Sequence, residues 1–308
     1  MIEDVINLLS ATLFSMTPIL LAATGEIITE KAGVVNIGLE GIFIVSSFSA
    51  AVATLVLGNN PLLGLSIGAF IGLLAGVLHG IISVYLRGDQ IIAGVGFNSF
   101  AYGISVLGMI GLWGSYSSSP TVNKMQNIQL SMAKNTVLTI PPLALLAILV
   151  GIIAWWFLEK TKWGLRLRAC GEEPRAAEAM GVNVFRTRFY ATVIGGTLTG
   201  IGGAFLVVGW LGSFIKTISA GRGFIALAIV AFSNWNPLMA ILGAFIFGFF
   251  DALSTYLPLK IQSITGQQFT AEANLFLTIP YIATLVIVAA IMKRVKMPRA
   301  LGKPYIKE

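Results

Sequence analysis

Long apolar runs separated by short polar stretches occupy almost the whole chain. Most of the runs reach about the 20 residues that a helix needs to cross the hydrocarbon core of a bilayer. They extend over residues 5–23, 39–57, 62–86, 91–113, 137–158, 189–211, 224–232, 237–257 and 275–292. The pattern predicts an all-α polytopic bundle of about eight to ten membrane helices.

One run, GFIALAIVAF, has about ten residues and is too short for an ordinary membrane helix. It follows Arg222 and ends before Asn234. We interpret it as a short buried span, a broken helix or a re-entrant segment, which is stable at membrane depth only where protein or a cavity surrounds it. Because proline suits the first turn of a helix, Pro237 is expected to open the next one.

The composition supports a membrane protein. Hydrophobic residues make up 56% of the 308 residues and charged residues only 11%, compared with roughly 25% charged in soluble proteins. The mean hydropathy is +0.87. We therefore expect one transmembrane domain over residues 1–308. The N-terminal stretch MIEDVINLLSATLF has no basic region and no clear cleavage site, so it is expected to remain as part of the first helix.

Basic residues indicate the orientation, because lysine and arginine gather in cytoplasmic loops. Thirteen of the twenty lie in a loop at about residues 159–188 and in a C-terminal tail at about residues 293–308. Both segments are predicted to be cytoplasmic, and the polar stretches GSYSSSPTVNKMQNIQLSMAKN and KIQSITGQQFTAEAN to be external. Simple alternation then places residues 1–4 outside, unless GEIITEKAGVVNIG is itself a partial crossing.

Several other chemistries are excluded. The net charge of +7 does not indicate nucleic-acid binding, since the basic residues flank apolar runs instead of forming one basic face. A single cysteine, Cys170, and a single histidine, His79, rule out a disulfide framework and a cysteine or histidine metal cluster. No G-x-x-x-x-G-K-[ST] or H-E-x-x-H motif occurs. We predict no catalytic and no metal site, which leaves transport, channel or scaffold functions.

The run GLSIGAFIGLLAGVLHG predicts close helix packing. Glycine recurs at every fourth position, so one helical face is a smooth groove that another backbone can enter. These residues are Gly64, Gly68, Gly72, Gly76 and Gly80. His79 lies beside this face, and we interpret it as a hydrogen-bonded interface residue, with a direct role in transport as the alternative.

Polar residues in apolar surroundings are candidates for a translocation path, because they are costly at membrane depth unless partnered or facing water. The candidates are Asn36, Glu40, Asn98, Ser99 and Asn234. Asn36 and Glu40, four residues apart, are expected to share a helical face. Their glycine-rich segment forms either a pore wall near a broken helix or an ordinary capped turn. Asp89 is interpreted as the N-cap of the next helix.

The stretch CGEEPRAAEAMGV is a polar segment inside the first basic loop. Pro174 suits the first helical position, and Gly181 suits the position just past the end. The negative charges of Glu172 and Glu173 favour a helix N-terminus at this point. Residues 174–180 are therefore predicted to form a two-turn helix. Because so short a helix is unstable alone in water, we expect it to dock on a partner.

Four stretches together resemble the permease subunits of ABC importers, in the group for branched-chain amino acids, simple sugars and nucleosides. They are GEIITEKAGVVNIGLEGIFIVSSFSA, LRGDQIIAGVGFNSFAYGIS, WGLRLRACGEEPRAAEAMGVNVFRTRFYATVIGGTLTGIGGAF and GRGFIALAIVAFSNWNPLMAILGAFIFGFFDAL. The resemblance covers about residues 18–292 and is stronger to the nucleoside or simple-sugar branch than to the amino-acid branch. Lys31 stands where arginine is usual in the first motif.

The resemblance implies a subunit of the cell membrane that moves a nucleoside or simple sugar by alternating access. Its implied partners are a second permease subunit, identical or paralogous, two cytoplasmic ATPases that bind ATP and Mg²⁺, and an external substrate-binding protein. The chain itself would hold no cofactor. The short helix would couple to the ATPase through Glu172, Glu173, Pro174, Arg175, Ala176, Ala177, Met180 and Gly181.

Other functions stay open as alternatives. A permease for branched-chain amino acids would share these motifs. An ion-coupled secondary transporter or channel would need an essential intramembrane acid, for which Glu40 and Asp251 are the candidates. A membrane-embedded enzyme lacks a plausible catalytic cluster.

Overall fold

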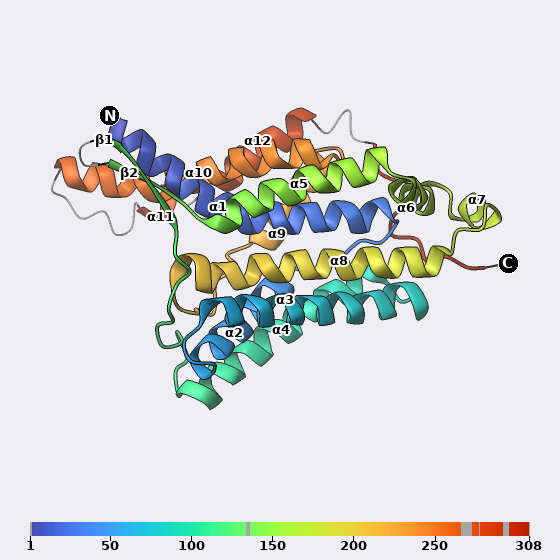
Figure 1. Ribbon diagram of the computed structural model, residues 1–308, viewed down its shortest axis with the longest axis horizontal. Coiled ribbons are helices and arrows are strands. Elements are labelled where there is room, and N and C mark those ends of the chain that lie inside the picture. Colours follow the sequence, from blue (N-terminus) through green and yellow to red (C-terminus); the bar gives the residue numbers. More distant parts are fainter. Residues whose placement is uncertain (1, 134–135, 266–272, 277, 292–295, 308) are drawn as a thin grey trace.

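Long helices lie side by side along one axis (Figure 1). The computed structural model describes residues 2–133, 136–265, 273–276, 278–291 and 296–307. The helices are α1 (Ile2–Lys31), α2 (Leu39–Val56), α3 (Pro61–Gly80), α4 (Gln90–Trp113), α5 (Pro142–Lys160), α6 (Lys162–Glu172), α7 (Pro174–Ala179), α8 (Val184–Phe205), α9 (Arg222–Phe232), α10 (Pro237–Thr265), α11 (Ala273–Phe276) and α12 (Ile279–Ile291). The π-helical segments η1 (Ile81–Tyr85) and η2 (Leu206–Leu211) continue α3 and α8.

Seven helices of the described part are long and apolar enough to cross a membrane: α1, α2, α3 with η1, α4, α5, α8 with η2, and α10. The short run GFIALAIVAF forms α9, which has 11 residues, and α12 has 13 described residues. With these two included, the helices agree with the predicted range. The all-α polytopic fold class is therefore confirmed.

Local sequence signals determine where several helices begin. Oδ1 of Asp89 accepts hydrogen bonds from the backbone N–H groups of Ile91 and Ile92, both at 2.9 Å, so the predicted N-cap of α4 is confirmed. The helix α10 begins at Pro237, also as predicted. By contrast, α1 continues past its apolar run through GEIITEK as far as Lys31, so this stretch is not a separate crossing.

A hairpin precedes α5. Strands β1 (Ile128–Ala133) and β2 (Thr136–Ile140) pair in antiparallel register, with Ile128 opposite Ile140. The prediction of a membrane helix from residue 137 is wrong at its start, because α5 begins only at Pro142. The β-branched residues of TVLTI favour a strand, and the two prolines that follow end it and open the helix.

The glycine face of α3 lies against α8. A Cβ atom added at Gly72 would meet the backbone of Gly196 and Gly200, and one added at Gly76 would meet the backbone of Thr192. The approach is reciprocal, since Gly196 and Gly200 would in turn meet α3. Two backbones this close leave no room for a side chain between them, which is the arrangement of small residues in membrane-helix interfaces.

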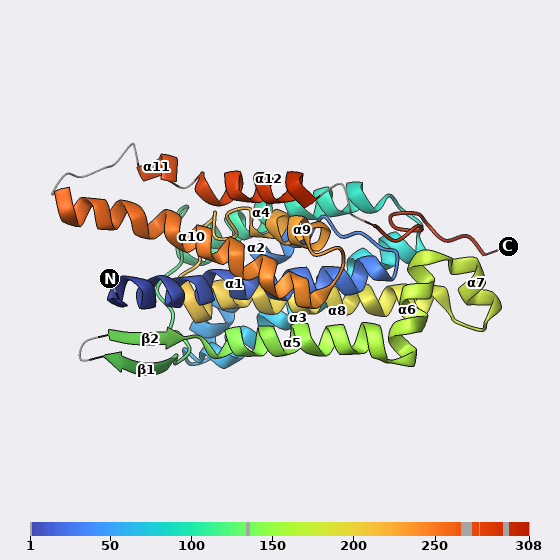
Figure 2. The same ribbon diagram turned by 90° about the horizontal axis from the view of Figure 1, so that it is seen from above.

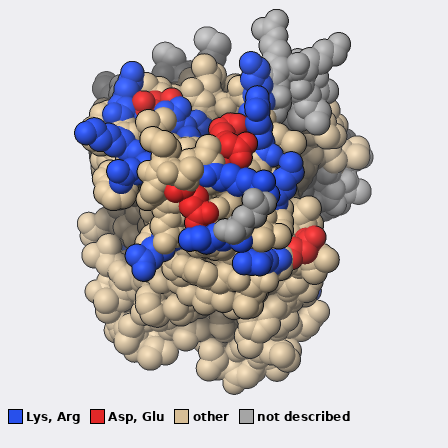
Figure 3. All heavy atoms as spheres, turned by 90° about the vertical axis from the view of Figure 1, so that its right-hand side faces the viewer, with Lys and Arg blue, Asp and Glu red and all other residues tan. Residues whose placement is uncertain are grey.

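The polar segments separate to the two ends of the bundle. The basic loop, which contains α6 and α7, lies at the same end as the described part of the C-terminal tail (Figure 1). The hairpin and the N-terminus lie at the opposite end (Figure 2). Lysine and arginine side chains gather on the first of these ends (Figure 3). Lys293 and Arg294 of the tail lie outside the described residues, as does much of KIQSITGQQFTAEAN.

The α3–α8 contact generates a test of packing. Gly72→Leu should lower the apparent Tm of the purified protein by several degrees, because overpacking a closed contact costs roughly 1–3 kcal/mol. Gly103→Leu on α4 is the matched control, since nothing lies within 4 Å of a Cβ added there. Thermal unfolding in detergent measures both variants. Equal Tm values for the two would contradict the close contact.

Candidate functional site

Two interrupted segments meet inside the bundle. The chain is not helical between Lys31 and Leu39, before α2, or in the stretch that precedes α9. Glu40 in the first turn of α2 joins them: its Oε1 accepts from the N–H of Gly221 at 2.8 Å, and its Oε2 accepts from the N–H of Gly223 at 2.7 Å. A carboxylate here satisfies donors that lack a helical partner and complements the helix dipole of α9.

Glycine permits this approach. A Cβ atom at Gly223 would collide with the backbone of Glu40, and Gly221 has φ +76°, in the left-handed region that favours glycine. The beginnings of α2 and α9 are therefore fitted directly to each other through one side chain.

Arg222 at the start of α9 adds a charged group beside this junction. Its guanidinium lies 3.2 Å from Oδ2 of Asp251 on α10, and 5.0 Å from the ring centroid of Trp210 in η2. Ser15 of α1 also donates to Asp251. Both charges are thus paired, and four helical elements converge on the pair, which keeps the cost of charges at this depth low.

Asn36 and Asn98 support the first interruption. Asn98 accepts from the N–H of Gly41 at 2.7 Å and donates to the carbonyl of Ile37 at 3.0 Å. Asn36 accepts from the N–H of Gly38 at 2.9 Å. The expectation that Asn36 and Glu40 share a helical face is wrong, because Asn36 lies in the non-helical stretch whereas Glu40 lies in α2.

The remaining path candidates lie elsewhere. Ser99 is exposed on α4 and donates to the carbonyl of Val95 at 3.3 Å. Asn234 lies in the turn after α9 with φ +51°, and its side chain accepts from the N–H of Lys296 at 2.8 Å. The structure therefore brings Asn36, Glu40 and Asn98 to one junction and places Asn234 against the C-terminal tail.

His79 also contacts the first interruption. Its Nε2 donates to the carbonyl of Val35 at 2.8 Å. Together with Asn36, Phe97 and Phe100 it lines a cavity of about 290 Å³ between α3 and α4. This hydrogen bond matches the interface role expected for His79. Within the described part of the chain, no group of three His, Cys, Asp or Glu residues is placed to hold a metal ion.

Two buried acids on α1 were missed from the sequence. Glu26 is fully buried, and its Oε1 accepts from the N–H of Asn36 at 2.7 Å. Glu30 accepts from Nε1 of Trp235 at 2.6 Å. Their four-residue spacing was the available signal, but the stretch that contains them was interpreted as a pore wall near a broken helix or an ordinary capped turn, whereas it continues α1.

At the basic end, the predicted short helix is present as α7. Pro174 is its first residue, and Gly181 follows it with φ +83°. Ala177 packs inward against Cys170, Val184 and Tyr305. The outer side carries the exposed residues Glu172, Glu173, Arg175, Ala176, Ala179 and Met180, of which Met180 is 84% exposed. A partner at this end would therefore meet the outer side of α7.

The C-terminal tail packs against α7 and the end of α6. The sequence did not indicate this contact. The N–H of Ala300 donates to the carbonyl of Gly171 at 2.9 Å. Tyr305 donates to Glu178 of α7, and Lys307 lies 3.2 Å from the same carboxylate. The hydrogen bond from Tyr305 holds the pKa of Glu178 below its usual value, so this acid stays charged near neutral pH.

Comparisons with known proteins show which family the chain resembles. Residues 8–293 match the family model described as "Branched-chain amino acid transport system / permease component". The chain is 33% identical to the nucleoside ABC transporter permease protein NupC of Lactococcus lactis, with 99% of each chain covered. It is 32% identical to the guanosine ABC transporter permease protein NupQ of Bacillus subtilis, again with 99% of each covered. It is 31% identical to a putative glucose ABC transporter permease protein of Haloferax volcanii, with 98% of each covered. No solved structure matches.

The paired charges at the junction give a second test. Arg222→Met should destabilise the protein by roughly 1–3 kcal/mol, because it leaves the half-buried Asp251 without its counter-ion. The double variant Arg222→Met, Asp251→Leu removes both charges and should recover most of that loss. Denaturant or thermal unfolding of the two variants measures the difference. A double variant as unstable as the single one would contradict the pairing.

Proposed function

The chain belongs to the branched-chain amino acid transport system/permease component family, and from this premise we propose that it is the membrane-spanning subunit of an ABC importer for nucleosides. Members of this family are permease components and are not themselves catalytic. The proposed reaction is therefore transport alone, with ATP hydrolysis in a separate subunit.

The observation that carries the proposal is the exposed side of α7 at the basic end of the bundle. A two-turn helix is unstable in isolation, yet here α7 is closed at its C-terminal end by the backbone N–H of Met180, held by the C-terminal tail and left exposed on one side. The chain has no nucleotide-binding G-x-x-x-x-G-K-[ST] loop of its own. An external ATPase that docks on α7 would supply both the missing contact and the energy.

Electrostatics at the junction favour an uncharged cargo. Glu40 is capped by backbone N–H groups, and Arg222 is paired with Asp251. A zwitterionic amino acid needs complementary charges for its ammonium and carboxylate groups, whereas a nucleoside needs mainly hydrogen bonds and apolar contact. Relatives named for nucleosides and guanosine point the same way. A sugar, the cargo named for the Haloferax relative, meets the same electrostatic condition and is the second candidate.

The same contacts weigh against an ion-coupled transporter. That mechanism needs an intramembrane acid that can exchange its proton or ion during each cycle. Glu40 and Asp251 were its candidates, and both carboxylates are already engaged by donors from other elements.

The proposed orientation places the basic end in the cytoplasm of a cell membrane, following the distribution of lysine and arginine. ATPase subunits then meet α7 from the cytoplasm, while the hairpin end faces outside, where a substrate-binding protein delivers cargo. The N-terminus of α1 lies at this external end. A second permease subunit, identical or paralogous, completes the path, and the two halves rock to alternate access.

The coupling assignment is tested at Met180. Met180→Asp should lower both uptake and substrate-stimulated ATP hydrolysis by about tenfold or more, because a charge is introduced at an exposed position without disturbing the core. Met180→Leu is the matched control, since it keeps an apolar side chain of similar size at the same exposed position. Transport assays in proteoliposomes with the ATPase measure both. If Met180→Asp retained full uptake, α7 would not be the coupling helix.

The cargo and the energy source are tested together by whole-cell uptake. Labelled guanosine should accumulate in cells that express the full transporter, and unlabelled nucleosides should compete while leucine should not. A protonophore applied with ATP levels maintained should leave the rate unchanged. Competition by leucine would indicate an amino-acid permease, and loss of uptake with the protonophore would indicate ion coupling.

A further inference from the structure

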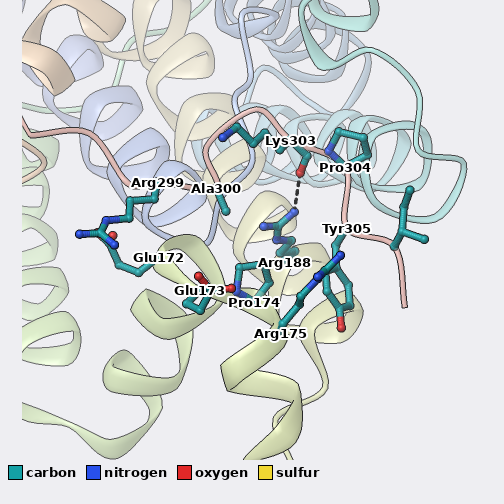
Figure 4. Close-up of a pocket in the computed structure, with 11 residues that line it drawn as sticks. Glu172, Glu173, Pro174, Arg175, Arg188, Arg299, Ala300, Lys303, Pro304 and Tyr305 are labelled. Atoms are coloured by element: carbon teal, nitrogen blue, oxygen red, sulfur yellow. Dashed lines mark hydrogen bonds between the residues drawn. The ribbon is translucent and has the colours of Figure 1, made fainter. Parts of the chain in front are cut away.

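A cavity of about 350 Å³ lies between the beginning of α7 and the C-terminal tail. Figure 4 shows the residues that line it, some of which begin the segment that we expect to dock on the ATPase. Among the described residues, its lining includes the basic side chains of Arg188, Arg299 and Lys303, with Glu172 and Glu173 as the acids. The cavity therefore has the charge and the size to accept an acidic side chain.

Arg188 is the central residue of this lining (Figure 4). It is only 2% exposed, and its guanidinium donates to the carbonyls of Lys303 at 2.9 Å and Cys170 at 3.0 Å. Its Nε is buried without a hydrogen-bond partner. Among the described residues, no carboxylate lies within ion-pair distance of this arginine.

A buried cation that meets only neutral carbonyls is unusual, because burial of a charge without a counter-charge is costly. By contrast, the half-buried Arg222 has Asp251 as its counter-ion. An anion that enters the cavity beside Arg188 would supply what this site lacks, with Arg299 and Lys303 at its margin.

We propose that this cavity receives an acidic side chain of the ATPase subunit, so that docking engages the C-terminal tail as well as α7. The inference rests on the proposed function. The occupant is assigned to the ATPase because Glu172 to Arg175, where α7 begins, line the cavity. The helix α7 lies at one end of the bundle, away from its long sides (Figure 1). The ATPase would then contact the outer side of α7 and also the cavity between α7 and the tail.

Zero-length carbodiimide cross-linking of the assembled transporter tests the proposal directly. Lys303 is the residue of the described lining that has a primary amine, so it should form an amide with an aspartate or glutamate of the ATPase, identified by mass spectrometry. Lys162, which is exposed at the same end but does not line the cavity, is the internal control and should give no such product.

A charge-reversal experiment gives the functional counterpart. Arg299→Glu should weaken ATPase binding by about tenfold, whereas Lys162→Glu should change it less than twofold. Both positions are exposed, so neither variant is expected to affect folding. Changing the cross-linked acid of the ATPase to lysine should restore binding to Arg299→Glu.

Three results would overturn the proposal while leaving the proposed function intact. One is that Lys303 cross-links only to residues of the permease itself while the transporter still couples ATP hydrolysis to uptake. Another is unchanged ATPase binding by Arg299→Glu. The third is that inorganic phosphate or vesicles of anionic lipid protect Lys303 from chemical modification as well as the ATPase does. The cavity would then be a general anion site. If the wild-type chain bound no ATPase at all, the proposed function would fail first.

Discussion

Backbone N–H and carbonyl groups at membrane depth must be hydrogen-bonded within the protein, and this structure depends on how that requirement is met at its two helix interruptions. Before α2, the N–H of Val35 donates to Gln90 at 2.8 Å, and its carbonyl accepts from His79 at 2.8 Å. Before α9, the free N–H groups of Gly221 and Gly223 are taken by Glu40. Side chains thus replace the lost helical bonds, and each replacement also ties one helix to another.

The sequence predicted the elements that rest on local rules. Apolar run length gave the membrane helices, Asp89 and Pro237 marked two helix starts, and Pro174 with Gly181 delimited α7. The predictions from sequence were wrong where a residue bonds to partners that are distant in the chain. Nothing in the sequence around Asn36 shows that its neighbours bond to α3 and α4, and an assumed helix there placed it wrongly on one face with Glu40. The short strand β2 was absorbed into an apolar run because its residues are as apolar as those of α5.

The same limit applies to charges. Glu40 and Asp251 are acidic residues in apolar segments of the sequence. An ion-coupling residue and a structural residue would both give this pattern. Only the three-dimensional partners separate these roles: backbone N–H groups for one, and Arg222 and Ser15 for the other. A polar residue in a membrane sequence therefore indicates that a partner exists, and the identity of that partner decides its function.

The helix α8 connects the basic end of the bundle with the Glu40 junction. It begins beside the basic end, where Arg188 bonds the tail and the segment before α7. Along its length, Gly195 contacts Gly25 of α1, and Gly200 contacts α3, with backbones too close for either neighbour to slide independently. It continues into η2, where Trp210 covers Arg222 at the start of α9. Because close-packed interiors transmit displacement instead of absorbing it, a shift of the coupling segment under the proposed function would reach the Glu40 junction through α8. That junction is held by hydrogen bonds and one ion pair, which makes it more easily rearranged than the glycine contacts that lead to it.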